Sequence, residues 1–181
     1  MRSEVSGILS DLDRVLLDAA AIRSRVTAMA GTIERDFAGK TLTVIIIMDG
    51  ALFFVADLLR AIDLPMQIVS MSASSYHGGT KSSGEVKLPW PQDLDLRGKH
   101  VLLLDDILDT GLTLGAVHDR LEAEGAATLK TAVLLKKRRV QAREICVDYI
   151  GFEIEDEFVV GYGMDYNGCF RNLPCIGTLK L

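Results

Sequence analysis

Short apolar runs and amphipathic segments alternate along the chain, and this alternation predicts a sheet with helices on both of its faces. Runs rich in apolar and β-branched residues are typical of parallel strands that are buried on both sides. Four such runs predict central strands, namely Thr43–Met48, Met66–Met71, Val101–Leu104 and Thr128–Leu135. A fifth run, Arg14–Leu17, predicts a short edge strand. We therefore expect an α/β fold with a doubly wound, mainly parallel central sheet flanked by helices.

Apolar residues recur at helical spacing between these strands, which predicts the helices that cover the sheet. Asp18 is placed to cap the first helix, because its side chain carries the oxygen that helix N-termini prefer. One apolar face of that helix would consist of Ile22, Val26, Ala30, Ile33 and Phe37. Ala51–Ile62 predicts a second helix. The spacing of Leu114, Val117 and Leu121 predicts a third.

The segment Ser72–Gly84 is polar and rich in Gly and Ser, and it is too long for a tight turn. A loop of this kind in a compact domain is usually either functional or disordered. Because loops that close over a site sequester reactive intermediates, we expect a mobile lid over about residues 72–87. The lid would contain Ser74, Ser75 and Tyr76.

A second irregular segment, Cys146–Phe170, mixes strand-like and turn-like pieces. We expect it to belong to a small hood lobe over the carboxyl edge of the sheet, formed by the N-terminal segment and about residues 146–181. The sequence contains no internal repeat and no low-complexity segment. Residues 1–181 therefore predict one domain, long enough to bury a sizeable core.

Composition narrows the class of protein without identifying its chemistry. With 49% hydrophobic and 25% charged residues, the composition is typical of a soluble globular protein. No apolar run approaches the roughly 18 residues of a membrane span, and no signal-peptide pattern opens the chain. Three cysteines without CxxC spacing favour reduced thiols in a cytoplasmic protein. The net charge of −5 argues against broad nucleic-acid binding.

The stretch Val101–Leu114 combines a buried strand, two carboxylates and a predicted phosphate-binding loop. The strand is followed by Asp105 and Asp106, whose oxygens suit magnesium or sugar hydroxyls. A short polar loop then leads into a helix, where free backbone N–H groups and the helix dipole favour an anion. The residues expected to hold a phosphate are Asp109, Thr110, Gly111, Leu112 and Thr113. An acid among these amides is unexpected for a pure anion site, so Asp109 is a candidate catalytic residue.

The loop sequence DDILDTGLT resembles the phosphoribosyl-diphosphate motif of type I phosphoribosyltransferases, and neither a Walker A loop nor a GxGxxG string occurs. The resemblance to hypoxanthine-guanine phosphoribosyltransferases covers nearly the whole chain. Ala73–Tyr76 resembles that family's lid, Val133–Lys137 its base-recognising lysine segment, and Tyr149–Tyr166 its purine-binding tail. Arg171 stands in the family's usual FR pair. This resemblance implies the type I phosphoribosyltransferase fold.

The same resemblance implies a purine-salvage reaction. The 5-phosphoribosyl group of phosphoribosyl diphosphate would pass to N9 of hypoxanthine or guanine, giving IMP or GMP and pyrophosphate. Magnesium would neutralise charge on the leaving diphosphate. Members of the family are commonly dimers or tetramers, so we expect a homodimer or homotetramer. Neither a nucleic acid nor a membrane is expected as a partner.

The roles of individual residues follow from the same resemblance. Asp109 would handle the proton on purine N7, and Lys136 would donate to purine O6, because an ammonium group only donates hydrogen bonds. Phe158 would stack on the purine ring. The Val159 carbonyl would accept from the base, and Ile107 would form an apolar wall.

The remaining residues would surround the sugar and the two phosphates. Asp105 and Asp106 would bind the ribose hydroxyls directly or through magnesium. Asp165 would be a further magnesium-contacting carboxylate beside the purine. Arg171 and the loop with Asp49 and Gly50 would hold pyrophosphate.

Each residue type also has an ordinary structural explanation. Asp109 is also placed to cap the helix that follows it, and Asp105 and Asp106 also fit a solvated strand end. Phe158 lies in a β-branched run typical of a core. Asp165 and Arg171 also fit ordinary surface charges. The run Lys136–Arg139 also fits a solvated strand end, and only Lys136 within it is assigned a function.

Asp49 departs from the family pattern, which often has a basic residue or a neutral amide before this glycine. In many members a peptide bond of this loop adopts a non-proline cis form. A carboxylate about 4 Å from a polyanion is repelled by about 1 kcal/mol in water and roughly 4 at intermediate dielectric. The enzyme interpretation therefore requires that Asp49 points outward, or that it contacts magnesium or a cation of a neighbouring subunit.

Other functions on the same fold remain open at this point. An RNA-binding regulator, as in pyrimidine-operon attenuation proteins, needs a basic face, and only Lys136–Arg139 offers one. Lys136 and the purine-binding tail disfavour adenine and pyrimidines, while xanthine is not separated from hypoxanthine and guanine. A synthase-like protein or an inactive sensor is disfavoured by the complete set of Asp105, Asp106 and Asp109.

Overall fold

The computed structural model describes residues 8–72 and 94–180. Ser74, Ser75 and Tyr76 of the predicted lid lie outside these ranges. The elements, in chain order, are η1 Ile8–Asp11, β1 Leu12–Leu17, α1 Ala19–Asp36, β2 Leu42–Met48, α2 Leu52–Arg60, β3 Met66–Ser72, β4 His100–Leu108, α3 Leu112–Ala123, β5 Thr128–Lys137, β6 Tyr149–Ile154 and β7 Ile176–Leu179. Within the described part of the chain, no helix is both long and apolar enough to cross a membrane.

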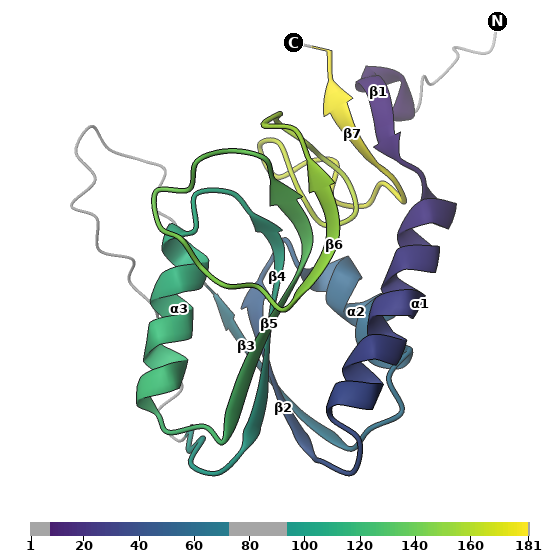
Figure 1. The fold of residues 1–181 in the computed structure, drawn as a ribbon. Helices are drawn as coiled ribbons and strands as arrows, with labels where there is room; N and C mark the ends of the chain where they lie inside the picture. Colours follow the sequence, from purple (N-terminus) through teal and green to yellow (C-terminus); the bar gives the residue numbers. More distant parts are fainter. Residues whose placement is uncertain (1–7, 73–93, 181) are drawn as a thin grey trace, which may run out of the picture.

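The central sheet has five parallel strands in the order β3-β2-β4-β5-β6, which confirms the predicted α/β class (Figure 1). Four of these strands cover the runs predicted from the sequence. The fifth, β6, lies in the segment that was expected to belong to the hood lobe. The strand predicted at Arg14–Leu17 is present as β1, but it pairs with β7 in a separate antiparallel sheet. It is therefore not an edge strand of the central sheet.

Helices cover the central sheet on both faces, with α1 and α2 on one side and α3 on the other (Figure 1). In β2, Val44 and Ile46 pack on the side of α1 and α2, while Ile45 and Ile47 pack on the side of α3. Successive side chains of a strand point to opposite faces, so a strand covered on both faces needs apolar residues at every position. This requirement explains the uninterrupted apolar runs.

Helix α1 begins as predicted, because the Asp18 side chain accepts the Ala21 backbone N–H at 2.8 Å. The helix also holds the outer edge of the sheet. Arg25 donates to the Gly151 carbonyl at 2.7 Å and to the Ile150 carbonyl at 2.6 Å. An exposed strand edge otherwise presents unpaired backbone groups, so these bonds both cover β6 and fix it against α1.

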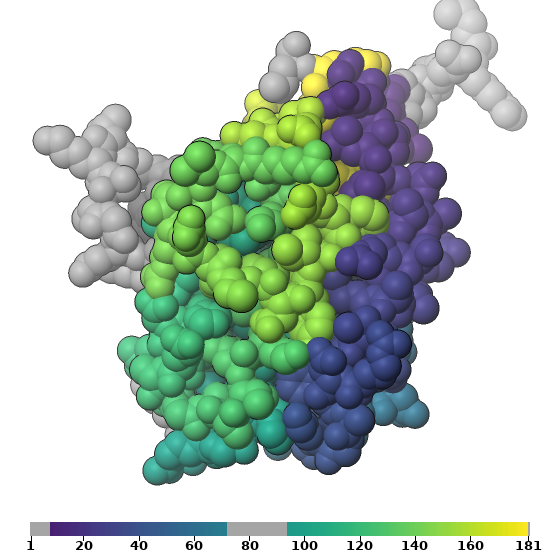
Figure 2. Space-filling model, in the orientation of Figure 1, coloured from purple at the N-terminus to yellow at the C-terminus, as the bar shows by residue number. Residues whose placement is uncertain are grey.

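A small lobe lies over the carboxyl ends of the central strands (Figure 1). It combines β1, β7 and the loops after β6, and it has an apolar cluster of its own formed by Leu12, Val160, Leu173 and Cys175. The purple N-terminal segment and the yellow C-terminal strand lie together at this end of the molecule (Figure 2). Because β6 belongs to the central sheet, the C-terminal part of this lobe begins after Ile154.

The close packing of β6 on β5 makes a test of the sheet edge. A Cβ atom at Gly151 would lie 2.3 Å from the Leu134 carbonyl oxygen. Because backbone must shift to relieve this contact, we expect Gly151→Ala to lower the free energy of unfolding by about 1–3 kcal/mol. Denaturant unfolding of the purified variant measures the change.

Gly31→Ala is the matched control, because a Cβ atom at the helical Gly31 would meet nothing within 4 Å apart from its chain neighbours and the backbone of its own helix. It should be neutral or stabilising by up to about 1 kcal/mol. Equal stability of the Gly151→Ala variant and the wild-type protein would contradict the tight register of β6 on β5.

Candidate active site

A cavity of about 280 Å³ lies where the loops that follow β2, β4 and β5 meet the hood lobe. Its lining comes from segments that are far apart in the sequence: Gly50, Asp106, Ile107, Asp109, Lys137, Phe158, Val159, Met164, Asp165 and Arg171. Eight of these ten residues were identified from the sequence. Lys137 and Met164 were not. In parallel α/β sheets, ligands bind outside the carboxyl ends of the strands, and this cavity has that position.

Asp105 and Asp106 lie within β4 rather than after it. The strand continues to Leu108, because Ile107 and Leu108 still pair with β5. Asp105 is only 8% exposed, whereas Asp106 lines the cavity. The alternation of side chains along a strand explains why the two neighbours have different surroundings. The alternative of a solvated strand end is therefore wrong for this pair.

The two carboxyl groups are held against each other in a largely buried setting. The Asp106 N–H donates to Asp105 Oδ1 at 3.0 Å, and the Ile107 N–H donates to Asp106 Oδ1 at 2.8 Å. Burial raises the pKa of Asp105 well above its ordinary value, and the neighbouring charge of Asp106 raises it further. Burial also raises the pKa of Asp106, although its hydrogen bonds and the charge of Arg171 oppose this rise.

The loop after β2 passes directly over Asp106. A Cβ atom at Gly50 would lie 1.9 Å from Asp106 Oδ2, so a side chain at this position would displace the carboxylate. The Met48–Asp49 peptide bond is cis. The Asp49 side chain is exposed and is not part of the cavity lining, in contrast to Gly50. The loop thus contributes backbone to the site.

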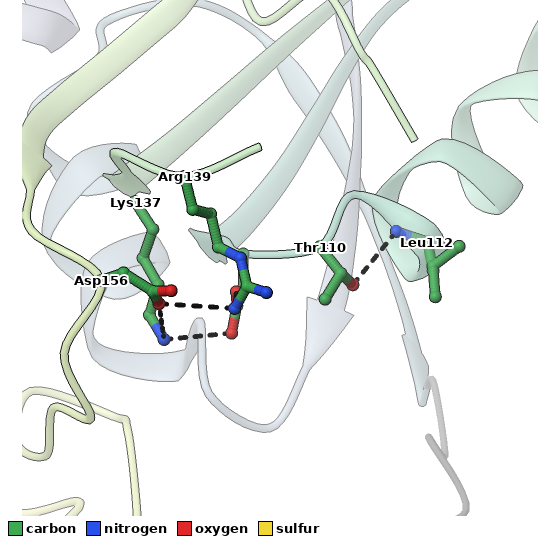
Figure 3. Close-up of polar contacts among 6 residues, drawn as sticks. Thr110, Leu112, Lys137, Arg139 and Asp156 are labelled. Carbon is green, nitrogen blue, oxygen red and sulfur yellow. Dashed lines mark hydrogen bonds and ion pairs between the residues drawn. The ribbon is translucent and has the colours of Figure 1, made fainter. Parts of the chain in front are cut away.

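The predicted phosphate loop connects β4 to α3. Gly111 begins the helix with a φ of +79°, and a Cβ atom there would lie 2.1 Å from the Arg143 carbonyl oxygen. The Leu112 N–H donates to Thr110 Oγ1 at 3.5 Å (Figure 3). The first N–H groups of a helix have no partner inside the helix, which suits an anion. Of the five residues predicted to bind phosphate, only Asp109 lines the cavity. Thr110 and Gly111 follow it in the loop, and Leu112 and Thr113 are the first two residues of α3.

Ion pairs join four charged side chains in a ring, which we call the ion-pair ring: Asp109, Lys137, Asp156 and Arg139. Figure 3 labels Lys137, Arg139 and Asp156. Asp109 Oδ2 accepts from Lys137 Nζ at 3.1 Å, and Asp109 Oδ1 accepts from Arg139 Nη1 at 3.0 Å. Asp156 Oδ1 lies 3.5 Å from Lys137 Nζ and 3.4 Å from Arg139 Nη1. Asp109 therefore does not cap α3, and that alternative is wrong.

The lysine at the cavity is Lys137, whereas the sequence analysis assigned this role to Lys136. Lys136 pairs with Leu108 and Glu153 in the sheet and is not part of the cavity lining. Lys137 is 9% exposed, and its Nζ reaches Asp109. Two adjacent lysines at a strand end point to opposite sides, and only the register of the strand decides which of them faces the site.

Three of the four cations in Lys136–Arg139 form ion pairs with acids. Lys137 and Arg139 belong to the ion-pair ring. Arg138 pairs instead with Glu155 at 3.0 Å and with Glu153 at 3.5 Å, on the exposed surface. The strand-end alternative therefore holds for Arg138 and fails for its two neighbours.

The hood lobe supplies an aromatic ring to the cavity. Phe158 is 50% exposed, and its ring lies edge-to-face against Tyr166 with 5.8 Å between centroids. This exposure excludes the core alternative for Phe158. Val159 beside it is 6% exposed and belongs to the main hydrophobic cluster, so it anchors the segment.

Asp165 and Arg171 form an ion pair at 2.8 Å within the cavity lining. Arg171 also donates to the Gly163 carbonyl at 2.6 Å, and Asp165 accepts the Gly168 N–H at 2.8 Å. These contacts hold both side chains in place. They are therefore not isolated surface charges.

Lys137, Arg139, Asp156 and Met164 were missed as site residues by the sequence analysis. A usable signal existed for Arg139 and Asp156, because each follows the end of a strand, and β5 and β6 are parallel neighbours. Opposite charges beyond the ends of two such strands lie close together. The signal went unused because the sequence did not identify β6 as part of the central sheet. Met164 has no comparable signal.

Comparison with known proteins agrees with this geometry. The family model described as phosphoribosyl transferase domain matches residues 15–167. A hypoxanthine-guanine phosphoribosyltransferase of Streptococcus pneumoniae is 40% identical over 171 residues, which cover 94% of this chain and 95% of that protein.

Solved structures give the same relationship. The crystal structure of a hypoxanthine phosphoribosyltransferase from Staphylococcus aureus has a TM-score of 0.90 at 39% identity, covering 98% of this chain and 96% of that one. A hypoxanthine-guanine-xanthine phosphoribosyltransferase has a TM-score of 0.86 at 32% identity, covering 95% of this chain and 99% of that one. With the fold, the cavity and these relatives in agreement, the chain belongs to the phosphoribosyltransferase family and is a member of its hypoxanthine-guanine phosphoribosyltransferase group.

Proposed function

We propose that this protein transfers the 5-phosphoribosyl group of phosphoribosyl diphosphate to N9 of hypoxanthine or guanine, releasing pyrophosphate and forming IMP or GMP. The observation that carries this proposal is the contact between an acid and an ammonium group at the cavity, where Asp109 Oδ2 and Lys137 Nζ lie 3.1 Å apart. In a 6-oxopurine, N7 and O6 lie on the same edge of the base. An acceptor beside a donor therefore matches a protonated N7 beside O6.

The base would lie between the hood lobe and β4. The exposed ring of Phe158 offers a stacking surface, and Ile107 offers an apolar contact on the cavity wall. The Val159 carbonyl would accept from an N–H of the base. Because the ammonium of Lys137 only donates hydrogen bonds, it favours a 6-oxo group and disfavours the 6-amino group of adenine.

The reaction would proceed as the ribose C1 becomes oxocarbenium-like, while pyrophosphate leaves and N9 attacks. Asp109 would accept the N7 proton or stabilise the positive charge that develops on the base. The start of α3, with Thr110, Gly111, Leu112 and Thr113, would bind the 5′-phosphate through backbone N–H groups. Arg171 and the backbone at Gly50 would face pyrophosphate.

Magnesium fits the acidic pair of β4. Asp105 and Asp106 are buried carboxylates whose pKa values are raised, and a divalent cation or ribose hydroxyls would offset the cost of their charge. Among the described residues, Asp105, Asp106 and Asp165 do not form a cluster with ligand atoms within 4.8 Å of one another. Magnesium commonly binds through one or two carboxylates and substrate phosphates, so an open set of this kind suits it. The ion would neutralise charge on the diphosphate.

Xanthine is the second candidate substrate, because one structural relative is a hypoxanthine-guanine-xanthine phosphoribosyltransferase. An RNA-binding role has weaker support, since Lys137, Arg138 and Arg139 are all paired with acids. We further expect a cytoplasmic enzyme that forms a homodimer or homotetramer, as the family resemblance implies.

A spectrophotometric assay with phosphoribosyl diphosphate, magnesium and each purine in turn tests the proposal. We expect activity with hypoxanthine and guanine and little with adenine. Failure to convert any 6-oxopurine would overturn it, and conversion of xanthine alone would select the second candidate.

Substitution of the two adjacent lysines separates their roles. Lys137→Ala should lower kcat/KM for the purine by about 10²-fold, the scale for a buried polar partner lost at a substrate group. Lys136→Ala should change it less than about threefold, because its side chain is not part of the cavity lining. A larger loss for Lys136→Ala than for Lys137→Ala would show that Lys136 is the lysine that contacts the purine.

Asp109→Asn should lower kcat by about 10²-fold, because a general base contributes at least that much.

The exposed carboxylate in the pyrophosphate loop provides a second test. The charge of Asp49 would repel the diphosphate by about 1 kcal/mol in water. Asp49→Asn removes this repulsion, so it should lower KM for phosphoribosyl diphosphate about fivefold and leave KM for the purine unchanged. Asp63→Asn, beyond the opposite end of α2, is the control. An unchanged KM for phosphoribosyl diphosphate would show that Asp49 has no part in pyrophosphate binding.

The buried carboxyl group of Asp105 in β4 predicts how the stability of the ligand-free protein depends on pH. The pKa of Asp105 is raised in the folded state, so its contribution to stability is full below its ordinary value of about 4 and is lost as the pH rises through the folded value. Asp105→Asn removes this loss, so the ligand-free variant should melt at a higher temperature at pH 7, by about 2–4 °C for each kcal/mol gained. The gain should shrink as the pH falls toward about 4. A destabilised variant at pH 7 would contradict the burial of an uncompensated charge.

A further inference from the structure

Two members of the ion-pair ring, Arg139 and Asp156, have no role in the reaction described above. Both lie beside groups that do. Arg139 Nη1 donates to Asp109 Oδ1 at 3.0 Å, and Asp156 Oδ1 lies 3.5 Å from Lys137 Nζ. We propose that Arg139 and Asp156 are positioning residues that hold Asp109 and Lys137 in the arrangement that reads the O6 and N7 edge of the purine. This inference rests on the proposed function.

The connectivity of the ring supports a positioning role. Each cation bridges the two acids, and each acid bridges the two cations, so the four side chains carry no net charge as a group. Asp109 uses both of its oxygens within the ring, one for each cation. A carboxylate with two fixed partners has a defined plane, and its remaining lone pairs stay available for an N–H of the base.

The ring also gives Asp109 and Lys137 each a second partner of opposite charge. Asp109 and Lys137 pair with each other, and without further partners each would lose its only compensating charge when the other turned to a substrate atom. Asp156 gives Lys137 a second acid, and Arg139 gives Asp109 a second cation. When O6 and N7 arrive, both groups already have partners that keep their charges compensated, so little reorganisation is required.

The position of the ring in the fold adds a mechanical argument. Arg139 follows β5, and Asp156 follows β6, two residues before Phe158. The ring therefore joins the phosphate loop, through Asp109, to the hood segment that offers the stacking ring. Opening it would loosen the two walls of the purine site relative to each other while leaving the start of α3 intact.

The chain contains a matched control one residue earlier on each side. Arg138 and Glu155 form an ion pair of the same chemistry at 3.0 Å, between the same two segments. Their side chains are 56% and 66% exposed, and they do not line the cavity. Loss of this pair removes an equal number of charges without touching Asp109 or Lys137.

Steady-state kinetics of the full-length protein tests the proposal. Arg139→Gln and Asp156→Asn should each lower kcat with hypoxanthine and guanine by about tenfold, the scale of one coupled pair, and leave KM for phosphoribosyl diphosphate unchanged. Arg139→Lys keeps the charge and should recover part of the loss. Arg138→Gln and Glu155→Gln should match the wild-type protein. If Arg139→Gln resembles Arg138→Gln, the ring has no positioning role and the proposal falls.

A double-substitution cycle distinguishes positioning from a general loss of structure. In an Asp109→Asn background, Arg139→Gln should lower the residual kcat no further, because the group that it positions is already absent. An undiminished tenfold loss in that background would refute the proposal. If the wild-type protein is active but Arg139→Gln costs tenfold in the Asp109→Asn background, only the positioning role of the ring is overturned. A wild-type protein inactive with every 6-oxopurine overturns the proposed function and the ring together.

Discussion

The register between β4 and β5 is the constraint on which the site depends. The two strands are parallel neighbours, and Leu108 lies opposite Lys136. Asp109 directly follows the end of β4, and Lys137 is the last residue of β5. The two residues therefore lie beside each other, and their side chains meet at 3.1 Å. A shift of one residue in either strand would turn one of them away from the cavity. The position of the Asp109–Lys137 pair at the cavity thus depends on the backbone hydrogen bonds between β4 and β5.

Burial of charge is the second feature that shapes this molecule. Asp105 and Asp106 lie inside a strand where apolar residues would be more favourable, and the loop at Gly50 closes over Asp106 without leaving room for a Cβ atom. Such an arrangement weakens the ligand-free fold and prepares the site for groups that donate hydrogen bonds or carry positive charge. Proteins commonly accept local instability of this kind where they bind ligands.

The hood lobe completes a site that the central sheet leaves open. It brings Phe158, Asp165 and Arg171 over the strand ends and fixes them through ion pairs and backbone bonds. The ion-pair ring adds a direct connection between the two parts at the edge of the cavity.

The sequence by itself determined the α/β class, four of the five central strands and the helix capped by Asp18, because apolar periodicity and helix capping are local signals. The DDILDTGLT motif located Asp106 and Asp109 of the cavity lining, and the hood residues of that lining were named from the family resemblance. The sequence did not determine which of Lys136 and Lys137 faces the site, where β6 pairs or why β4 continues through its two acids. Those outcomes depend on strand register and on neighbours distant in the chain. The sequence places Arg139 and Asp156 each just beyond the end of a strand, but only the tertiary contacts that make β5 and β6 neighbours bring the two charges together.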